Sequence, residues 1–292
     1  MKKIGFLYYR SWAYEILKYI STMQMERRDF IISDVICPHG LGDDLSFLST
    51  DTTTIHYVDP EKSGDLVALV QQSQIELIFC YSWSWIVPEI LVRDYYCICL
   101  HPSRLPAYRG GSPIQNQVLN GDVESAVSVL RMNNDIDSGP IYRQVGMNID
   151  APIEEVFERM SGIGCVITKG LITDYLMDDL KFYEQDHDKA TLVKRRKPKD
   201  SCLRLKEMGN MRYEDFHRMV NVLRDPYPNV YFDLKDCQIR IQQVHAFRNL
   251  PQDQDVSYLN VASTHDDLER GPIFLKMLDC FALISQYTMQ RV

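Results

Sequence analysis

The feature that most constrains the fold is an alternation of short apolar runs with helical patterns over the first 132 residues. Apolar runs of strand length occupy residues 3–9, 30–37, 53–58, 75–80, 97–100 and 126–132. Helical patterns separate them at residues 12–25, 65–72, 87–93 and 114–120. Strands that alternate with helices in this way are typical of a parallel sheet with helices on both faces. The sequence therefore predicts an α/β fold built on a mainly parallel, twisted sheet.

The pattern changes after a long helical stretch at residues 150–179. A basic segment, KRRKPKDS, occupies residues 194–201, and a further helix is expected at residues 213–223. Short alternating runs follow at residues 230–234, 239–246, 257–262, 273–278 and 281–288. Alternation with a period of two predicts half-buried strands. We therefore expect a large domain at residues 1–190, a linker at 191–212 and a small β-rich domain at 213–292.

Composition narrows the class of protein. The net charge of −8 argues against nucleic acid as the main partner. No apolar stretch approaches the length of a membrane span, and the first apolar run is too short for a signal peptide, so no membrane partner is expected. The eight cysteines include no CxxC pair and no metal-ligand spacing, which favours free thiols, a cytoplasmic location and no metal. No GxGxxG follows the first run, so a dinucleotide cofactor is not indicated.

Two side chains suited to acid–base chemistry follow the ends of two predicted strands. His101 ends the run at residues 97–100, and Asp137 lies in the acidic turn after the run at residues 126–132. Ligands bind at the carboxyl ends of strands in open α/β sheets, and a histidine paired with a carboxylate commonly moves a proton. We predict that His101 and Asp137 are catalytic. The structural alternatives are a strand-end cap for His101 and a turn residue for Asp137.

The residues around this pair also carry a family resemblance. The segment HPSRLPAYRG at residues 101–110, followed by Asp-Ser-Gly at residues 137–139, resembles the folate-dependent formyltransferases. That family includes methionyl-tRNA formyltransferase, glycinamide ribonucleotide formyltransferase and the sugar N-formyltransferases of cell-envelope biosynthesis. The basic segment at 194–201, and the helix that ends in Asp-Pro-Tyr-Pro at 225–228, are most similar to the sugar enzymes. The resemblance covers residues 75–245 and implies a Rossmann-like formyltransferase domain with a smaller second domain.

The resemblance implies a reaction and a donor site. The formyl group of 10-formyl-tetrahydrofolate would move to the amino group of a nucleotide-linked amino-deoxy sugar, as in lipopolysaccharide or O-antigen biosynthesis. His101 would be the catalytic histidine and Asp137 the essential aspartate. Contacts to the pterin would come from two loops and a glycine: Ser84, Trp85, Ile86, Gly111, Asn133, Asn134, Asp135, Ile136 and Asp137.

For the acceptor, candidates follow the first predicted strand and include two distant arginines. Aromatic rings can stack on a base or sugar, and an arginine near a helix N-terminus can meet a diphosphate. The candidates are Tyr9, Arg10, Ser11, Arg109 and Arg196. A structural ion pair is the alternative for each arginine. A homodimer is compatible with the resemblance, but the sequence does not fix the oligomeric state.

One position departs from the family pattern. Relatives place an asparagine two residues before the histidine as an oxyanion donor, and this chain has Cys99 there. Leu100 should point to the opposite face of the strand, so Cys99 should share a face with His101. A thiol is a weaker donor than an amide, and losing a good oxyanion donor can cost on the order of a hundredfold in rate.

Three consequences of Cys99 stay open. Backbone N–H groups and His101 are enough to stabilise the oxyanion, or Asn116 or Asn133 supplies the missing oxyanion donor. In the third case the protein is a catalytically impaired homologue that binds folate or a nucleotide sugar. A nucleophilic role for Cys99 is unsupported by any second histidine nearby. The resemblance also leaves methionyl-tRNA formyltransferase open as the activity, which would call for a basic tRNA-binding surface.

Overall fold

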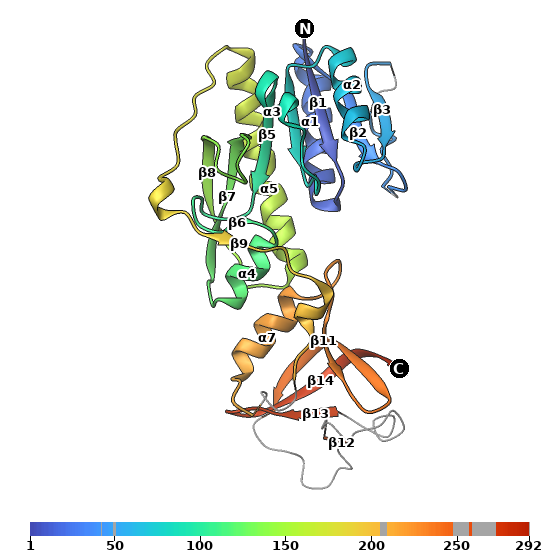
Figure 1. The fold of residues 1–292 in the computed structure, drawn as a ribbon, viewed down its shortest axis with the longest axis vertical. Helices are drawn as coiled ribbons and strands as arrows, with labels where there is room; N and C mark the ends of the chain where they lie inside the picture. The colour runs from blue at the N-terminus through green and yellow to red at the C-terminus, as the bar shows by residue number, and fades with distance from the viewer. Residues whose placement is uncertain (42, 49–50, 205–208, 248–256, 259–272, 292) are drawn as a thin grey trace. The chain divides into compact units, whose positions relative to one another are not determined.

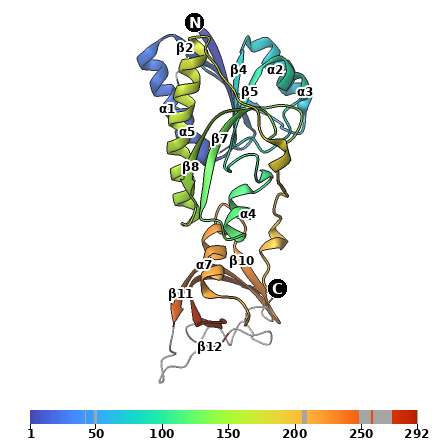
Figure 2. The ribbon, with the colours of Figure 1, turned by 90° about the vertical axis from the view of Figure 1, so that its left-hand side faces the viewer.

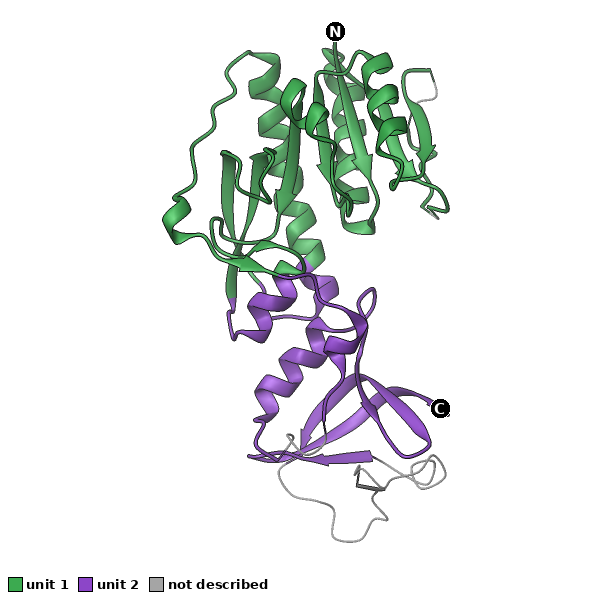
Figure 3. Cartoon of the chain, in the orientation of Figure 1, with its two compact units in different colours: residues 1–113, 124–148, 157–193 green, residues 114–123, 149–156, 194–292 purple. Residues whose placement is uncertain are grey.

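The computed structural model of the chain describes residues 1–41, 43–48, 51–204, 209–247, 257–258 and 273–291 (Figure 1). The chain divides into two compact units (Figure 3). Unit 1 comprises residues 1–113, 124–148 and 157–193, and unit 2 comprises residues 114–123, 149–156 and 194–292. The domain boundaries expected from the sequence stay a prediction.

Unit 1 is built on a seven-stranded sheet in the order β3-β2-β1-β4-β5-β7-β8. Its strands are β1 Lys2–Tyr8, β2 Phe30–Pro38, β3 Thr54–Val58, β4 Leu77–Tyr81, β5 Tyr96–His101, β7 Glu124–Arg131 and β8 Ile141–Asn148. The first five run parallel, whereas β7 is antiparallel to β5 and β8 is antiparallel to β7. The parallel strands are the ones that alternate with helices along the sequence, as crossover connections require.

Helices cover both faces of this sheet. In Figure 2, α1 Ser11–Arg27 and α5 Ile153–Leu176 lie on one face, while α2 Ser63–Ser73 and α3 Glu89–Asp94 lie on the other. On the α2 and α3 face, Leu66 and Leu91 pack with Cys97 in one buried cluster. On the opposite face, the Tyr81 hydroxyl is hydrogen-bonded to Thr168 Oγ1 of α5 at 2.9 Å.

A glycine allows α5 to approach β5 and α1 closely. A Cβ at Gly164 would lie 2.5 Å from Ile16 Cδ1 and 3.0 Å from Leu100 Cδ1, whereas one at Gly162 would meet no atom within 4 Å. A real Cβ at position 164 would therefore push on both α1 and the strand that carries His101. Leu100 thus faces α5, so its neighbours Cys99 and His101 face the other side of the sheet.

Unit 2 contains a five-stranded sheet in the order β10-β11-β14-β13-β12. Its strands are β10 Val230–Asp233, β11 Cys237–Phe247, β12 Ser257–Tyr258, β13 Ile273–Lys276 and β14 Phe281–Arg291. The pairs are antiparallel except for β12 with β13. Helix α7 Tyr213–Val222 buries Phe216 and Val220. Of the strand expected at residues 257–262, residues 259–262 lie outside the described part of the chain.

The predicted fold class is confirmed: a mainly parallel α/β sheet is joined to a smaller β-rich part. Helix α4 Pro113–Leu119 also occurs where the sequence predicted it. The sequence analysis missed β8 and a two-residue parallel pair, β6 Arg109–Gly110 with β9 Leu192–Val193. It also missed two 3₁₀ turns, η1 His187–Lys189 and η2 Pro198–Ser201. Within the described residues, no helix combines the length and apolar character needed to cross a bilayer.

Candidate active site

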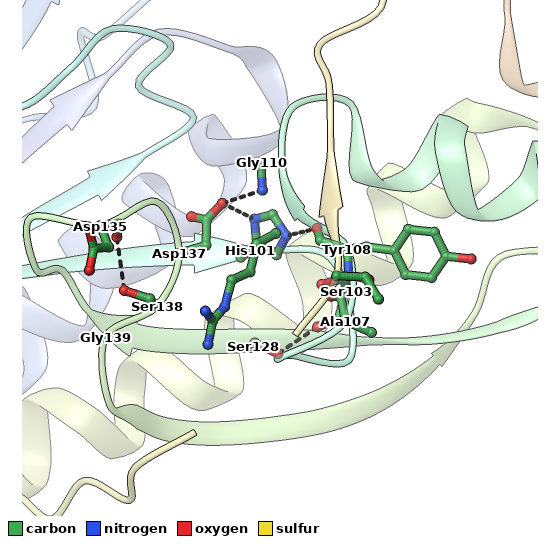
Figure 4. Close-up of polar contacts among 12 residues, drawn as sticks. His101, Ser103, Ala107, Tyr108, Gly110, Ser128, Asp135, Asp137, Ser138 and Gly139 are labelled. Atoms are coloured by element: carbon green, nitrogen blue, oxygen red, sulfur yellow. Dashed lines mark hydrogen bonds and ion pairs between the residues drawn. The ribbon is translucent and has the colours of Figure 1, made fainter. Parts of the chain in front are cut away.

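His101 is the last residue of β5 and is almost completely buried. The strand ends there because Pro102 follows and has no backbone N–H to continue a ladder. The His101 ring has an oxygen acceptor near each nitrogen: Nε2 lies 2.8 Å from the Tyr108 carbonyl oxygen, and Nδ1 lies 3.3 Å from Asp137 Oδ2 (Figure 4). Two acceptors suit a ring that carries a proton on both nitrogens, and the carboxylate complements its charge.

The loop after β5 is folded back so that the Tyr108 carbonyl faces this ring. Ser103 Oγ donates to the Ala107 carbonyl at 2.6 Å, and Ser128 Oγ of β7 donates to the Ser103 carbonyl at 2.6 Å (Figure 4). Gly110 has φ +103°, and a Cβ there would lie 2.4 Å from the Val193 carbonyl oxygen. Position 110 therefore requires glycine both for its backbone conformation and for the approach of β9.

The turn between β7 and β8 brings Asp137 to the same place. Asp137 has φ +49°, an uncommon backbone conformation for a residue other than glycine. Its Oδ2 accepts a hydrogen bond of 2.8 Å from the Gly110 N–H in addition to facing His101. A Cβ at Gly139 would lie 1.9 Å from the Arg131 carbonyl oxygen, so the turn packs directly on the end of β7. The structure thus brings His101 and Asp137 together, as the sequence analysis expected, while their catalytic roles stay predictions.

Cys99 lies on the same strand and the same side as His101. Its side chain is partly buried against Leu105, Leu130 and Ile141. Burial, with the negative charge of Asp137 as a further cause, raises the pKa of the Cys99 thiol well above its usual value. At neutral pH Cys99 is therefore a neutral thiol, which makes it a poor nucleophile and a weak hydrogen-bond donor.

The two loops predicted to bind a pterin are neighbours in unit 1. Asn134 Nδ2 donates a 2.8 Å hydrogen bond to Glu89 Oε1, which joins the turn at residues 133–137 to the start of α3 just after Ser84, Trp85 and Ile86. Ile86 is 91% exposed and Ile136 is 66% exposed. Each loop thus presents an isoleucine to solvent, and such side chains can cover a flat apolar ligand.

The residues proposed for the acceptor occupy different places. The Tyr9 and Trp85 rings contact each other edge to face with centroids 4.8 Å apart. The Arg10 guanidinium lies 5.4 Å from the Tyr9 ring centroid. Ser82 Oγ accepts hydrogen bonds from the Tyr9 and Arg10 N–H groups at 3.2 and 2.8 Å, just before α1 begins at Ser11. This contact was not foreseen from the sequence, and it fixes the backbone beside the predicted acceptor residues.

The two distant arginines belong to different units. Arg109, in unit 1, is buried and hydrogen-bonded to Gln185 and His187. Arg196, in unit 2, donates to the Asp200 carbonyl oxygen, and burial lowers the pKa of its guanidinium. Their contacts to an acceptor stay predictions.

The two asparagines weighed as replacements for the missing oxyanion donor also differ in position. Asn116 Nδ2 donates to the Lys194 carbonyl at 3.2 Å in unit 2. Asn133 lies in the turn with Asp137, and its Oδ1 accepts from Ser138 Oγ at 2.8 Å. Among the described residues, no group of three or more His, Cys, Asp and Glu side chains is arranged to hold a metal ion.

Comparisons with known proteins bear on the family and the fold. Residues 52–161 match the family model described as formyl transferase. Methionyl-tRNA formyltransferase of Rickettsia massiliae is 24% identical over 63% of this chain and 60% of its own length. The corresponding protein of Orientia tsutsugamushi is 24% identical over 79% of this chain and 72% of its own length. The chain therefore spans about three fifths of the Rickettsia massiliae protein.

Solved structures share the fold. A methionyl-tRNA formyltransferase from Clostridium thermocellum superposes with a TM-score of 0.63 and 21% identity over 87% of this chain and 96% of its own. A 4-N formyltransferase from Francisella tularensis superposes with a TM-score of 0.64 and 19% identity, over 79% of this chain and 92% of its own. HypX from Aquifex aeolicus, in complex with tetrahydrofolic acid, superposes with a TM-score of 0.68 and 12% identity, over 97% of this chain and 43% of its own. The family match includes His101 and Asp137, and the fold is that of known formyltransferases. Residues 52–161 are therefore similar to the formyl transferase family.

Proposed function

We propose that the chain is an N-formyltransferase that moves the formyl group of 10-formyl-tetrahydrofolate to the amino group of a nucleotide-linked amino-deoxy sugar. The observation that carries the proposal is the contact of His101 Nδ1 with Asp137 Oδ2, at 3.3 Å, inside the segment that matches the family. A buried histidine paired with a carboxylate at the carboxyl end of a parallel strand is suited to proton transfer.

In the proposed reaction, His101 and Asp137 assist both the loss of a proton from the attacking amine and the gain of a proton by N10 of the folate. The neutral amine attacks the formyl carbon, a C–N bond forms, and the carbonyl oxygen becomes an oxyanion. With Nδ1 facing Asp137, protonated His101 would turn its Nε2–H from the Tyr108 carbonyl to that oxyanion, or to N10 of the folate as the bond from N10 to the formyl carbon breaks. The attacking nitrogen loses one proton and N10 gains one, so the step is balanced. Asp137 stabilises the charged ring throughout.

The donor site rests on the two neighbouring loops at residues 84–86 and 133–137. The hydrogen bond from Asn134 joins the second loop to Glu89, three residues after the first loop, and both loops expose an isoleucine. The similarity of the fold to a HypX structure that contains tetrahydrofolic acid supports a folate donor. Contacts of the pterin with these loops and with Gly111 remain part of the proposal.

The acceptor is chosen between two classes. A net charge of −8 disfavours a polyanionic tRNA and leaves a small nucleotide sugar as the favoured acceptor. The structural likeness to a 4-N formyltransferase and to a sugar N-formyltransferase from Shewanella supports this choice. The curated relatives reported above are methionyl-tRNA formyltransferases, so methionyl-tRNA is the second candidate acceptor.

A catalytically impaired homologue that binds folate or a nucleotide sugar is the third candidate. The neutral thiol of Cys99 favours it, because a thiol replaces the amide donor of the family. Free cysteines are typical of a reducing compartment, so we predict a cytoplasmic location under all three candidate functions.

One panel experiment separates these candidates. Purified protein is incubated with 10-formyl-tetrahydrofolate and, in turn, with a set of nucleotide-linked amino sugars and with methionyl-tRNA. Formation of the formamide is followed by mass spectrometry, and donor binding by calorimetry. Formylation of an amino sugar supports the proposal, formylation of methionyl-tRNA alone replaces it, and donor binding without any product supports the impaired homologue.

A further inference from the structure

The turn that carries Asp137 is held by a residue outside the two motifs. Gln185 follows α5 in the chain and is 6% exposed. Its Nε2 donates to the Asp137 carbonyl at 2.9 Å and to the Gly139 carbonyl at 2.7 Å. One side-chain amide therefore fixes the two backbone carbonyls on either side of Ser138.

The orientation of that amide is set by a buried cation. Gln185 Oε1 accepts from Arg109 Nε at 3.1 Å and from Arg109 Nη2 at 2.7 Å. The reversed amide would place N–H donors against the guanidinium, so Arg109 selects the orientation in which both donors face the turn. Arg109 Nη2 also lies 3.1 Å from His187 Nδ1, and Arg109 is 7% exposed. Hydrogen bonds from a charged group buried in this way are stronger than those between neutral groups.

Strand β6, which consists of Arg109 and Gly110, also contacts the Asp137 carboxylate. Arg109 is followed by Gly110, whose N–H donates to Asp137 Oδ2 at 2.8 Å. The contacts form a closed ring that runs from the Asp137 carbonyl through Gln185 and Arg109 to Gly110 and back to the Asp137 side chain. Both the backbone and the carboxylate of Asp137 are thereby tied to β6.

This ring adds to the hydrogen bonds that Ser138 makes with Asn133 and Asp135 inside the turn. Asp137 is in the left-handed region, which a residue other than glycine keeps only where its surroundings hold it. The segment at residues 183–193 provides the surroundings: β9 pairs with β6, and Tyr183 exchanges two backbone hydrogen bonds with Ile141 of β8. Within this segment, Gln185 contacts the turn itself through the Asp137 and Gly139 carbonyls.

We propose that Gln185, oriented by the buried Arg109 guanidinium, is a positioning residue that holds the Asp137 carboxylate against His101. The kinetic part of this inference rests on the proposed formyl transfer. The positional part does not, because the hydrogen bond from Gly110 to Asp137 can be followed without any formyl transfer.

The test uses three single variants of the full chain. Gln185→Ala removes every contact of the amide. Gln185→Glu keeps the size and the acceptor for Arg109 but replaces the two donors with an oxygen. Gln24→Ala is the matched control, because Gln24 accepts from the Ile32 N–H at 2.6 Å and donates to Thr52 Oγ1 at 3.2 Å, in α1 and far along the chain from the site. The three tryptophans, at positions 12, 83 and 85, all lie in unit 1, and their fluorescence reports whether each variant folds.

Two readouts are compared. Hydrogen exchange of the Gly110 amide is measured by NMR on protein labelled with ¹⁵N at its 14 glycines. In both Gln185 variants the Gly110 exchange rate should rise about tenfold as its hydrogen bond weakens. In both, kcat should fall about 10- to 100-fold with little change in KM, because a displaced carboxylate affects the chemical step. Gln24→Ala should leave both readouts unchanged.

The possible outcomes divide cleanly. A Gly110 amide that stays protected in Gln185→Ala overturns the inference, whatever the activity. Faster exchange with unchanged kcat also overturns it, since the turn would then move without consequence. Full activity in Gln185→Glu would show that the residue only fills space. If the wild-type protein formylates no acceptor, the proposed function fails, and Gly110 exchange alone still decides whether Gln185 positions Asp137.

Discussion

Replacing one of two glycines in α5 tests how the strand that carries His101 is packed. A Cβ at Gly164 would meet Ile16 Cδ1 at 2.5 Å and Leu100 Cδ1 at 3.0 Å, whereas one at Gly162 would meet open space. Both positions lie in the interior of the same helix, so the gain from replacing glycine with alanine, about 1 kcal/mol, is common to both variants. The difference between the variants therefore isolates the cost of the overlap.

The magnitude follows from what must move. Ile16 is fully buried and Leu100 is 7% exposed, so neither side chain can turn out into solvent. The clashing atoms are the far ends of flexible side chains, which places the cost in the range of about 1–3 kcal/mol found for added methyl groups in cores. We expect Gly162→Ala to be as stable as the wild type or more stable, and Gly164→Ala to be about 1–3 kcal/mol less stable than Gly162→Ala.

The assay is urea denaturation followed by tryptophan fluorescence excited at 295 nm. All three tryptophans lie in unit 1, so the transition reports the unit that contains β5 and residues 157–176 of α5. Equal midpoints for the two variants would refute the packing described for Gly164. A destabilised Gly162→Ala would show instead that α5 is not exposed at that position.

Three further predictions concern other parts of the chain. In a steady-state assay, Cys99→Asn should keep or raise the rate of formyl transfer, because it restores an amide donor beside His101. Cys99→Ser keeps a hydrogen-bond donor and should also remain active in that assay. An inactive Cys99→Asn variant with intact folate binding would contradict this prediction. Tyr81→Phe should lower the stability of unit 1 by about 1–2 kcal/mol in urea denaturation, because Thr168 Oγ1 loses a buried donor, and an unchanged midpoint would rule out that hydrogen bond. Burial lowers the pKa of His217 from its usual 6.5. The charge of Asp150 acts in the opposite direction and raises this pKa, while His245 lowers it to a smaller extent. Below about pH 6.5 the unfolded chain therefore binds the proton more readily, and stability should fall as the pH drops towards 5, less steeply in His217→Gln; a stability profile identical in the two proteins would refute this assignment.

Local patterns were enough to predict the parallel part of the sheet. Runs such as residues 30–37 and 75–80 are mainly apolar, because parallel strands are buried on both faces, and they fall within one or two residues of β2 and β4. The antiparallel edge strand β8 was missed because its sequence, IYRQVGMN, mixes exposed and buried residues without a regular period. The pair β6 and β9 is too short to leave any pattern, and its partners lie 83 residues apart, as the Arg109 and Leu192 register shows.

The candidate site could be predicted in part for a related reason. His101 and Asp137 carry recognisable chemistry next to strand ends, and proline and glycine mark the loops around them. Gln185 stands in a polar segment with no periodicity, and its importance arises only when that segment folds back on Arg109 and Asp137. The hydrogen bonds of Ser82 with the start of α1 are likewise non-local and leave no signal in the sequence.

The central claim is that His101 and Asp137 together carry formyl transfer. The most direct measurement is transfer of an isotopically labelled formyl group from 10-formyl-tetrahydrofolate to a nucleotide-linked amino sugar by the wild type, His101→Ala and Asp137→Asn. Unchanged fluorescence unfolding and retained donor binding would show that both variants are folded. The account predicts transfer by the wild type and a loss of about a hundredfold or more in kcat for each variant. Near-normal kcat in either folded variant would contradict it.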